Sequence, residues 1–131
     1  MNPKILIVED QPLTQQMIGM LLEKLGYDYE VCDDGEQALA RLKAGAQEFE
    51  IVLLDLFMPK IDGISVLGHI RSNMPHLKVI IITASEDPSY CDTAMSHGAY
   101  AYLQKPFSPA KLQILLQELL PAPTFGSTQL S

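Results

Sequence analysis

Short apolar runs alternate with helix-like segments five times along the chain, and this alternation limits the fold more than any other feature. A bounded apolar run of a few residues is typical of a buried strand, whereas apolar residues three or four apart are typical of one helix face. Strands that alternate with helices predict a parallel sheet with right-handed crossovers on both faces, an α/β fold. The predicted strands are Ile5–Val8, Tyr27–Val31, Ile51–Leu54, Val79–Ile82 and Ala101–Leu103.

The segments between the predicted strands have helical spacing and recognisable ends. Gly26 follows the first of them, as is typical of a helix C-terminus. Ser108 and Pro109 open the last one as an N-cap followed by proline at the first helical position. The predicted helices cover residues 13–25, 35–43, 63–73, 89–97 and 109–120.

The length of the chain, 131 residues, suits one domain with a substantial core. We expect this domain to cover residues 1–120. The remaining residues, 121–131 (PAPTFGSTQLS), are rich in proline, serine, threonine and glycine and are predicted to be a tail or the start of a linker. No apolar run approaches the length of a membrane span, and the N-terminus lacks the small-residue cleavage site of a secretory signal.

Charge and cysteine usage indicate which partners and which compartment suit the domain. The net charge of −7 argues against direct contact with nucleic acid and suits cations or a partner with a basic face. The two cysteines, Cys32 and Cys91, lie far apart and form no CxxC pattern. They favour a reducing compartment, the cytoplasm, with a disulfide between them as the lesser alternative.

Polar side chains follow four of the five predicted strands. Ligands bind an open parallel sheet at the carboxyl ends of its strands, which all lie at one edge. Glu9 and Asp10 follow the first strand, Asp55 the third, Thr83 the fourth and Lys105 the fifth. Ser85 adds a second hydroxyl after the fourth strand, so the pattern predicts three acids, two hydroxyls and a lysine at one edge of the sheet.

Three carboxylates in one place repel one another unless a cation lies among them. Oxygen ligands of this kind suit Mg²⁺. An aspartate nucleophile beside Mg²⁺, a lysine and a hydroxyl is equipped to accept a phosphoryl group. Each residue alone has an ordinary explanation as a strand, turn or surface residue, so the hypothesis depends on their convergence from four strand ends.

With these residues in place, the chain resembles the receiver domain of two-component response regulators over residues 4 to about 120. Four motifs carry the resemblance. The resemblance implies a flavodoxin-like, doubly wound sheet of five parallel strands in the order 2-1-3-4-5. The motifs are KILIVED, LLDLFMPKIDG, IIITA and YLQKPF, in that order along the chain.

The resemblance also implies roles for the acidic residues. Asp55 is the expected phosphoacceptor, which takes a phosphoryl group from the phosphohistidine of a sensor histidine kinase or of a phosphotransfer protein. Asp10 and Asp55 are expected to ligate Mg²⁺, with Glu9 holding a metal-bound water and the backbone carbonyl of Phe57 as a further ligand. The domain would catalyse its own phosphotransfer and slow autodephosphorylation, and would not otherwise be an enzyme.

The remaining matched residues are expected to stabilise the phosphate and to transmit its presence. Thr83 and Lys105 would contact phosphoryl oxygens, and the bond between Lys105 and Pro106 is expected to be cis. Tyr102 matches the switch aromatic, which would turn inward as Thr83 moves toward the phosphate. The face formed by the fourth helix, fifth strand and fifth helix would then signal to a downstream effector, a fused output domain or a second copy in a phosphorylation-dependent homodimer.

Three alternatives stay open from the sequence. A phosphatase of the haloacid-dehalogenase type also uses an aspartate nucleophile and Mg²⁺, but has a second aspartate where this chain has Phe57. A flavin-binding protein needs a phosphate loop after the first strand, where this chain has the acidic EDQPLT. A pseudo-receiver that only binds partners would lack the complete set of site residues. If the domain is phosphorylated, Phe57 and Ser85 would flank the hydrolytic water, and Phe57 is predicted to shield the phosphate.

Overall fold

Strands and helices alternate along the chain as predicted. The computed structural model describes residues 3–58 and 61–120, and a short 3₁₀ helix precedes the third strand. The predicted tail at 121–131 lies outside the described residues. The elements are β1 (Lys4–Val8), α1 (Pro12–Leu25), β2 (Asp28–Cys32), α2 (Gly35–Gly45), η1 (Ala46–Glu48), β3 (Ile51–Asp55), α3 (Gly63–Asn73), β4 (Lys78–Thr83), α4 (Pro88–Ser96), β5 (Ala101–Gln104) and α5 (Pro109–Leu119).

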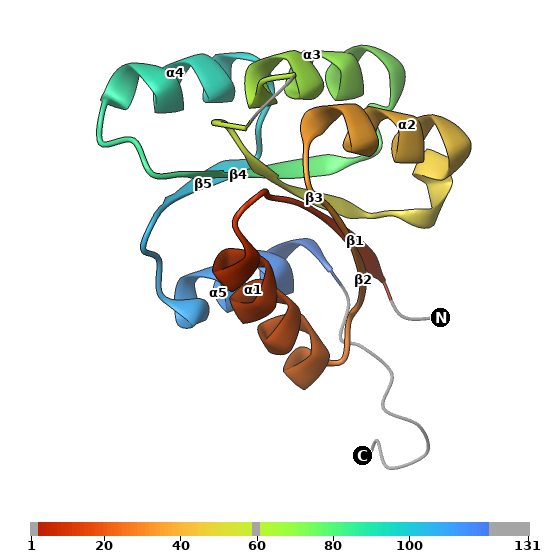
Figure 1. Cartoon of the computed structure of the whole chain (residues 1–131), viewed down its shortest axis with the longest axis vertical. Coiled ribbons are helices and arrows are strands. Elements are labelled where there is room, and N and C mark those ends of the chain that lie inside the picture. The colour runs from red at the N-terminus through yellow and green to blue at the C-terminus, as the bar shows by residue number, and fades with distance from the viewer. Residues whose placement is uncertain (1–2, 59–60, 121–131) are drawn as a thin grey trace.

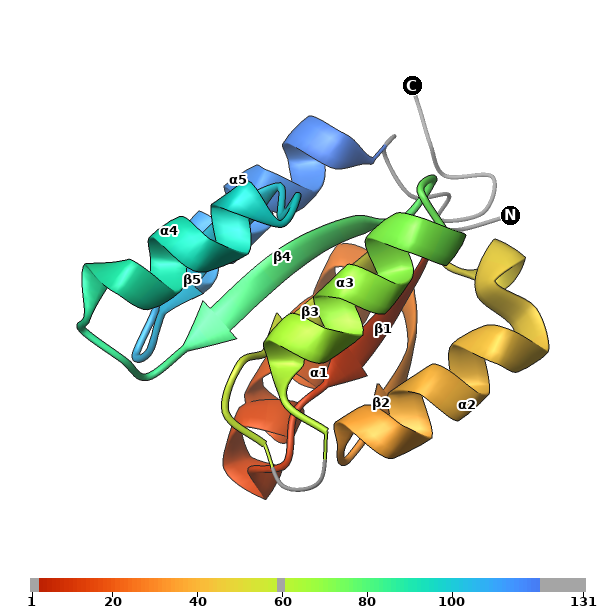
Figure 2. The same cartoon turned by 90° about the horizontal axis from the view of Figure 1, so that it is seen from above.

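The strands form one parallel sheet in the order β2-β1-β3-β4-β5, which confirms the order implied by the resemblance. Helices α2, α3 and α4 cover one face of the sheet, and α1 and α5 cover the other (Figure 1). Seen from above, α3 lies between α2 and α4 (Figure 2). The sheet is therefore doubly wound, with β3 at its centre between the interior strands β1 and β4.

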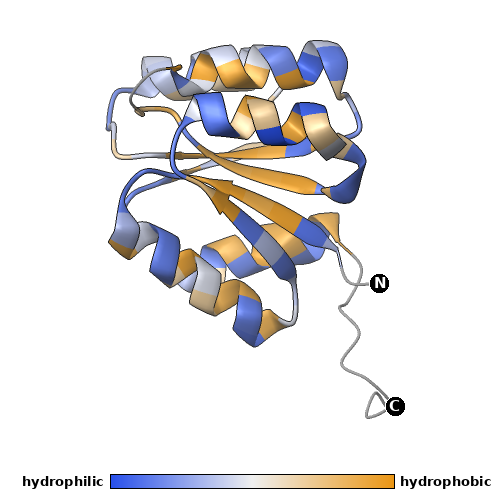
Figure 3. Ribbon diagram, turned by 45° about the vertical axis from the view of Figure 1, so that its right-hand side comes forward, coloured by the Kyte–Doolittle hydropathy of each residue, from blue (hydrophilic) through white to orange (hydrophobic). Residues whose placement is uncertain are grey.

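The central strands are apolar on both faces because helices cover both. Along β3, Val52 and Leu54 join the core under α2, α3 and α4, whereas Ile51 and Leu53 join the core over α1 and α5. All four side chains are fully buried. Successive strand residues point to opposite faces, so a continuous apolar run fills both cores at once. Figure 3 shows this apolar centre between amphipathic helices.

The predicted helix caps at Gly26 and Ser108 are confirmed, and one predicted strand begins a residue too early. Gly26 ends α1 in the left-handed conformation, at φ 87°. The amide of Tyr27 then donates to the carbonyl of Leu22, which keeps Tyr27 in the helix cap, so β2 begins at Asp28. At the start of α5, the Ser108 side chain accepts a hydrogen bond from the Lys111 amide, as predicted for an N-cap.

The structure also answers three smaller expectations. Cys32 and Cys91 are both free thiols, so the alternative of a disulfide between them is wrong. Burial raises the pKa of the Cys32 thiol to about 11. The peptide bond between Lys105 and Pro106 is cis, as the resemblance implies. Among the described residues, no helix is both long enough and apolar enough to cross a membrane.

Candidate functional site

The carboxyl ends of four strands bring the predicted site residues to one edge of the sheet. Glu9 and Asp10 directly follow β1, Asp55 is the last residue of β3, Thr83 is the last residue of β4, and Lys105 directly follows β5. These strands are parallel neighbours in the sheet, so their carboxyl ends point the same way. The sequence prediction of a shared edge is therefore confirmed for all five positions.

Three carboxylates converge at this edge. Glu9, Asp10 and Asp55 each offer an oxygen, and the three oxygens lie within 4.8 Å of one another. Glu9 has no exposed surface and Asp55 is 3% exposed, whereas Asp10 is the most exposed of the three. Carboxylates so close together, two of them buried, repel strongly and suit a hard divalent cation with oxygen ligands. The donor set fits Mg²⁺, with one side open to solvent at Asp10.

Lys105 supplies the positive charge that the buried acids require. Its Nζ lies 2.7 Å from Oε1 of Glu9 and 3.3 Å from Oδ2 of Asp55, and its side chain is only 13% exposed. Burial by itself would lower the pKa of Lys105, but the hydrogen bond with Glu9 and the charge of Asp55 together outweigh burial and raise it. Burial raises the pKa of Glu9 despite the nearby lysine.

A backbone amide of the loop after β3 holds the Asp55 carboxylate in place. The amide of Phe57 donates to Oδ1 of Asp55 over 3.1 Å, and the amide of Gly63 donates to the carbonyl of Leu56 over 3.0 Å. A Cβ at Gly63 would lie 2.5 Å from the Asp55 carbonyl oxygen, closer than any real contact. Glycine is therefore required where α3 starts against the end of β3. Asp62 caps this helix by accepting from the Ser65 amide.

Thr83 is buried beside the carboxylates, with 2% of its surface exposed. Its Oγ1 accepts a hydrogen bond from the amide of Ser85 over 3.0 Å. A threonine hydroxyl carries one proton to donate as well as its two acceptor lone pairs. Thr83 can therefore keep its bond with Ser85 while it donates to an oxygen bound at the carboxylate edge.

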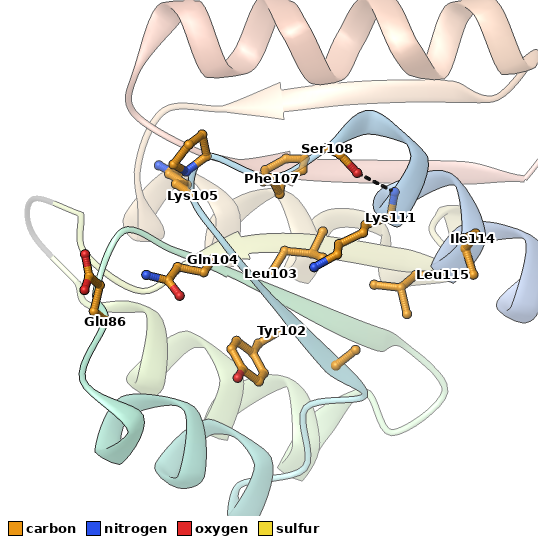
Figure 4. A pocket seen from close by; sticks show the side chains of 12 residues that line it. Glu86, Tyr102, Leu103, Gln104, Lys105, Phe107, Ser108, Lys111, Ile114 and Leu115 are labelled. Carbon is orange, nitrogen blue, oxygen red and sulfur yellow. Dashed lines mark hydrogen bonds between the residues drawn. The ribbon is translucent and has the colours of Figure 1, made fainter.

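Tyr102 lies on β5 away from the carboxylates, with 45% of its surface exposed. The nearby Cys91 side chain of α4 raises the pKa of Tyr102. Tyr102 lines a pocket of about 830 Å³ beside β5 and α5, which reaches from Ile114 to Lys105 (Figure 4). The predicted switch aromatic thus faces outward, in a pocket that extends to the site lysine.

Phe57 places its ring away from the protein core. The ring is 47% exposed and packs edge-on against Tyr90 of α4, with ring centroids 4.8 Å apart and an interplanar angle of 81°. Shielding of a phosphate by Phe57 stays a prediction, whereas this aromatic contact was not anticipated from the sequence.

Two glutamines that the sequence analysis did not single out hold the acidic strand end in place. The amide of Gln11 donates to Oε2 of Glu9 over 2.9 Å, and the side-chain oxygen of Gln11 lies 3.3 Å from Nζ of Lys105. Nε2 of Gln15 donates to the carbonyl of Glu9 over 2.5 Å and to Oδ1 of Asp33 over 2.7 Å. Their only signal in the sequence is their position, since Gln11 directly follows the acid pair and Gln15 lies in the first turn of α1.

Most of the chain matches a known domain family. The model of the response regulator receiver domain matches residues 5–117. The chain is 32% identical over 120 residues to the alkaline phosphatase synthesis transcriptional regulatory protein PhoP of Bacillus subtilis, covering 92% of this chain and 49% of PhoP. It is 36% identical over 119 residues to the probable transcriptional regulator ycf27 of Porphyridium aerugineum, covering 89% of this chain and 48% of that protein. The chain thus spans about half the length of the curated relatives it matches.

Solved structures show the same architecture over most of this chain. The Vibrio cholerae chemotaxis protein CheY4 superposes with a TM-score of 0.82 at 28% identity, covering 92% of this chain and 100% of CheY4. The receiver domain of the Francisella response regulator 1452 superposes with a TM-score of 0.83 at 32% identity, covering 90% of this chain and 96% of that one. Together these matches favour the receiver over the phosphatase and flavin-protein alternatives.

Proposed function

The chain belongs to the response regulator receiver domain family, and from this premise we propose that Asp55 accepts a phosphoryl group with Mg²⁺ as cofactor. Receiver domains are signalling domains of two-component systems, and not classical enzymes. The observation that carries the proposal is the convergence at Asp55 of two further carboxylates and the Nζ of Lys105, 3.3 Å away. We propose that residues 1–120 form this receiver and that 121–131 are a tail or the start of a linker.

In the proposed transfer, an Asp55 carboxylate oxygen attacks the phosphorus of a phosphohistidine. The phosphorus–nitrogen bond breaks, its electron pair stays on the histidine nitrogen, and an aspartyl phosphate forms. Mg²⁺, when bound by Asp10, Asp55 and the Phe57 carbonyl with Glu9 holding a bound water, would neutralise charge on the transferring oxygens. Lys105 would pair with one phosphoryl oxygen, and the Thr83 hydroxyl would donate to another. Hydrolysis by water would later release phosphate and restore the carboxylate.

The signal would leave through the face formed by α4, β5 and α5. Movement of Thr83 toward the phosphate would draw Tyr102 inward from its exposed position and away from Cys91. The pocket beside β5 and α5 would then change shape, because Tyr102 lines it. We infer that this face binds the output partner in a phosphorylation-dependent way.

The partners follow from the same proposal. Upstream we expect a sensor histidine kinase or a phosphotransfer protein, and downstream an effector protein or a fused output domain. The matched relatives include transcriptional regulators of about twice the length, which supports an output domain linked to this one. A phosphorylation-dependent homodimer is a third form of output. The net charge of −7 supports contact through proteins and not directly with nucleic acid, and the free thiols support the cytoplasm.

Incubation with beryllofluoride and Mg²⁺ tests the proposal, because beryllofluoride occupies the place of a phosphoryl group on an aspartate. We expect the wild-type chain to bind it in the presence of Mg²⁺, with a ¹⁹F signal distinct from that of free beryllofluoride, and Asp55→Asn not to bind it. Acetyl phosphate should in parallel add one phosphoryl group to the wild type, measured by intact-protein mass.

Asp62→Asn is the matched control, because Asp62 is an aspartate of the same loop and asparagine is an equally good N-cap. This variant should bind beryllofluoride as the wild type does. Binding or phosphorylation that survives in Asp55→Asn would contradict the assignment of Asp55 as the phosphoacceptor.

A further inference from the structure

One aromatic contact joins the loop that carries the phosphoacceptor to α4. Phe57 follows β3 by two residues, and Tyr90 lies in the first turn of α4, more than 30 positions further along the chain. Their rings meet edge to face, with centroids 4.8 Å apart. Aromatic pairs prefer this arrangement, which is favourable beyond the area that it buries. Both residues are about half exposed, so the contact is not part of either core.

The backbone of Phe57 is hydrogen-bonded to Asp55, the proposed nucleophile. Its amide donates to Oδ1 of Asp55 over 3.1 Å, while its ring packs on Tyr90. A cation bound at the Asp55 carboxylate would act on the backbone of Phe57 in two ways. It would act through this hydrogen bond, and through the Phe57 carbonyl, which is the expected further ligand of the cation. Any resulting shift of the Phe57 backbone would change the position of its ring against α4.

Helix α4 is held loosely enough to respond to such a shift. Ala94 is the residue that α4 buries, whereas α3 buries Gly63, Val66, Leu67 and Ile70. Elements with few buried contacts open and move at lower cost in free energy than elements with many. One aromatic contact in the first turn is therefore a substantial part of what fixes α4.

We propose that Phe57 and Tyr90 are a positioning pair that couples cation binding at Asp55 to the position of α4. The inference rests on the proposed function, because it needs Mg²⁺ to bind at the Asp55 carboxylate. It adds a second connection between the site and the output face, separate from Thr83 and Tyr102. Coupling between two places in a protein is reciprocal, so loss of the contact with α4 must also alter the affinity for Mg²⁺.

The affinity for Mg²⁺ in four variants tests the pair. We expect Tyr90→Leu and Phe57→Leu each to weaken Mg²⁺ binding about two- to tenfold, the range that an aromatic pair of this kind supplies. The double variant should bind no more weakly than the weaker single variant, because both substitutions remove the same contact. Tyr90→Phe keeps the ring and should bind as the wild type does. Calorimetric titration with MgCl₂ gives the affinities, and far-UV circular dichroism checks folding.

Tyr100→Leu is the matched control. Tyr100 is 40% exposed, as Tyr90 is, and its hydroxyl bonds with Glu118 of α5 instead of facing the loop after β3. This variant should leave the affinity for Mg²⁺ unchanged. In a second measurement, the amide resonance of Ala94 in α4 should shift as Mg²⁺ is added to the wild type, and this shift should be lost in Phe57→Leu.

The outcomes separate failure of the pair from failure of the proposed function. If the wild type binds no Mg²⁺, the proposed cofactor is wrong and the inference falls with it. If the wild type binds Mg²⁺ but Tyr90→Leu binds it within twofold of the wild type, the coupling alone is wrong. Additive losses in the double variant would overturn the coupling as well, because they show that the two side chains act separately.

Discussion

Removal of the Lys105 charge should destabilise the folded protein at neutral pH, and the size of the loss follows from the site. Nζ of Lys105 lies 2.7 Å from Glu9 and 3.3 Å from Asp55. At an effective dielectric constant of 20, these separations give Coulomb energies of about 6 and 5 kcal/mol before the cost of desolvation. Breaking a buried ion pair by removing one partner typically costs about 3–5 kcal/mol, because an unpaired charge is left behind. We expect Lys105→Met, in the absence of divalent cations, to lose a free energy of unfolding of that size.

The loss should depend on pH through Glu9. Its pKa is already raised by burial, and the carboxylate would lose its lysine partner in the variant, so its pKa would rise further. A carboxyl group with a raised pKa in the folded state contributes stability below its unfolded pKa, and this stability is lost as pH rises through the folded pKa. Lys105→Met should therefore come closer to the wild type at about pH 4 than at about pH 7.5. Lys105 itself, with a raised pKa, contributes its stability to the wild type below its unfolded pKa and loses it only at more alkaline pH.

Urea unfolding followed by far-UV circular dichroism, with a chelator present, measures both effects. Lys111→Met is the matched control, because Lys111 is an exposed lysine that lines the same pocket as Lys105. It should change the free energy of unfolding by less than about 0.5 kcal/mol. A loss below about 1 kcal/mol for Lys105→Met at neutral pH, or an equal loss at both pH values, would refute the reasoning that Lys105 neutralises buried carboxylates.

Two further predictions concern the loop after β3. Phe57→Ala should shorten the lifetime of the phosphorylated protein, because water would reach the phosphate more easily; an unchanged or longer lifetime, measured by loss of the phosphoryl group over time, would rule out shielding by Phe57. Gly63→Ala should destabilise the fold by about 1–3 kcal/mol in urea unfolding, because the added Cβ would lie 2.5 Å from the Asp55 carbonyl oxygen. Gly68→Ala, in the same helix with nothing within 4 Å of the added Cβ, should instead be neutral or stabilising.

The sheet could be predicted because its interior strands, β1, β3 and β4, are buried on both faces. Each central strand is a short apolar run that fills two cores, and such runs stand out against the amphipathic helices around them. Helix ends were equally visible where one residue type has a physical advantage, as Gly26 and Ser108 do. The start of β2 was missed by one residue because the amide of Tyr27 closes the end of α1, as the residue after a glycine cap commonly does.

The composition of the site could be predicted, but its contacts could not. Asp55 and its neutralising lysine are 50 residues apart in the chain, so only the common direction of the parallel strands brought them together in the prediction. No comparable rule predicts which conformation a side chain takes, or which residue it contacts, at the end of a strand. The ring of Phe57 could have turned toward the carboxylates, and its packing against Tyr90 depends on the conformations of two half-exposed side chains. The hydrogen bonds of Gln15 depend in the same way on where α1 lies against the loop after β2.

The division of packing between strands and α4 has a consequence for signalling. Every residue of β3, including Asp55, is buried, so the carboxylate that would react is held by a strand packed on both faces. Helix α4 buries Ala94 and otherwise contacts the rest of the domain through partly exposed side chains such as Tyr90. A charge added at Asp55 cannot easily move β3, because a close-packed core resists deformation. We therefore expect the response in α4, the α-helix with the fewest buried residues, and in the face beside it.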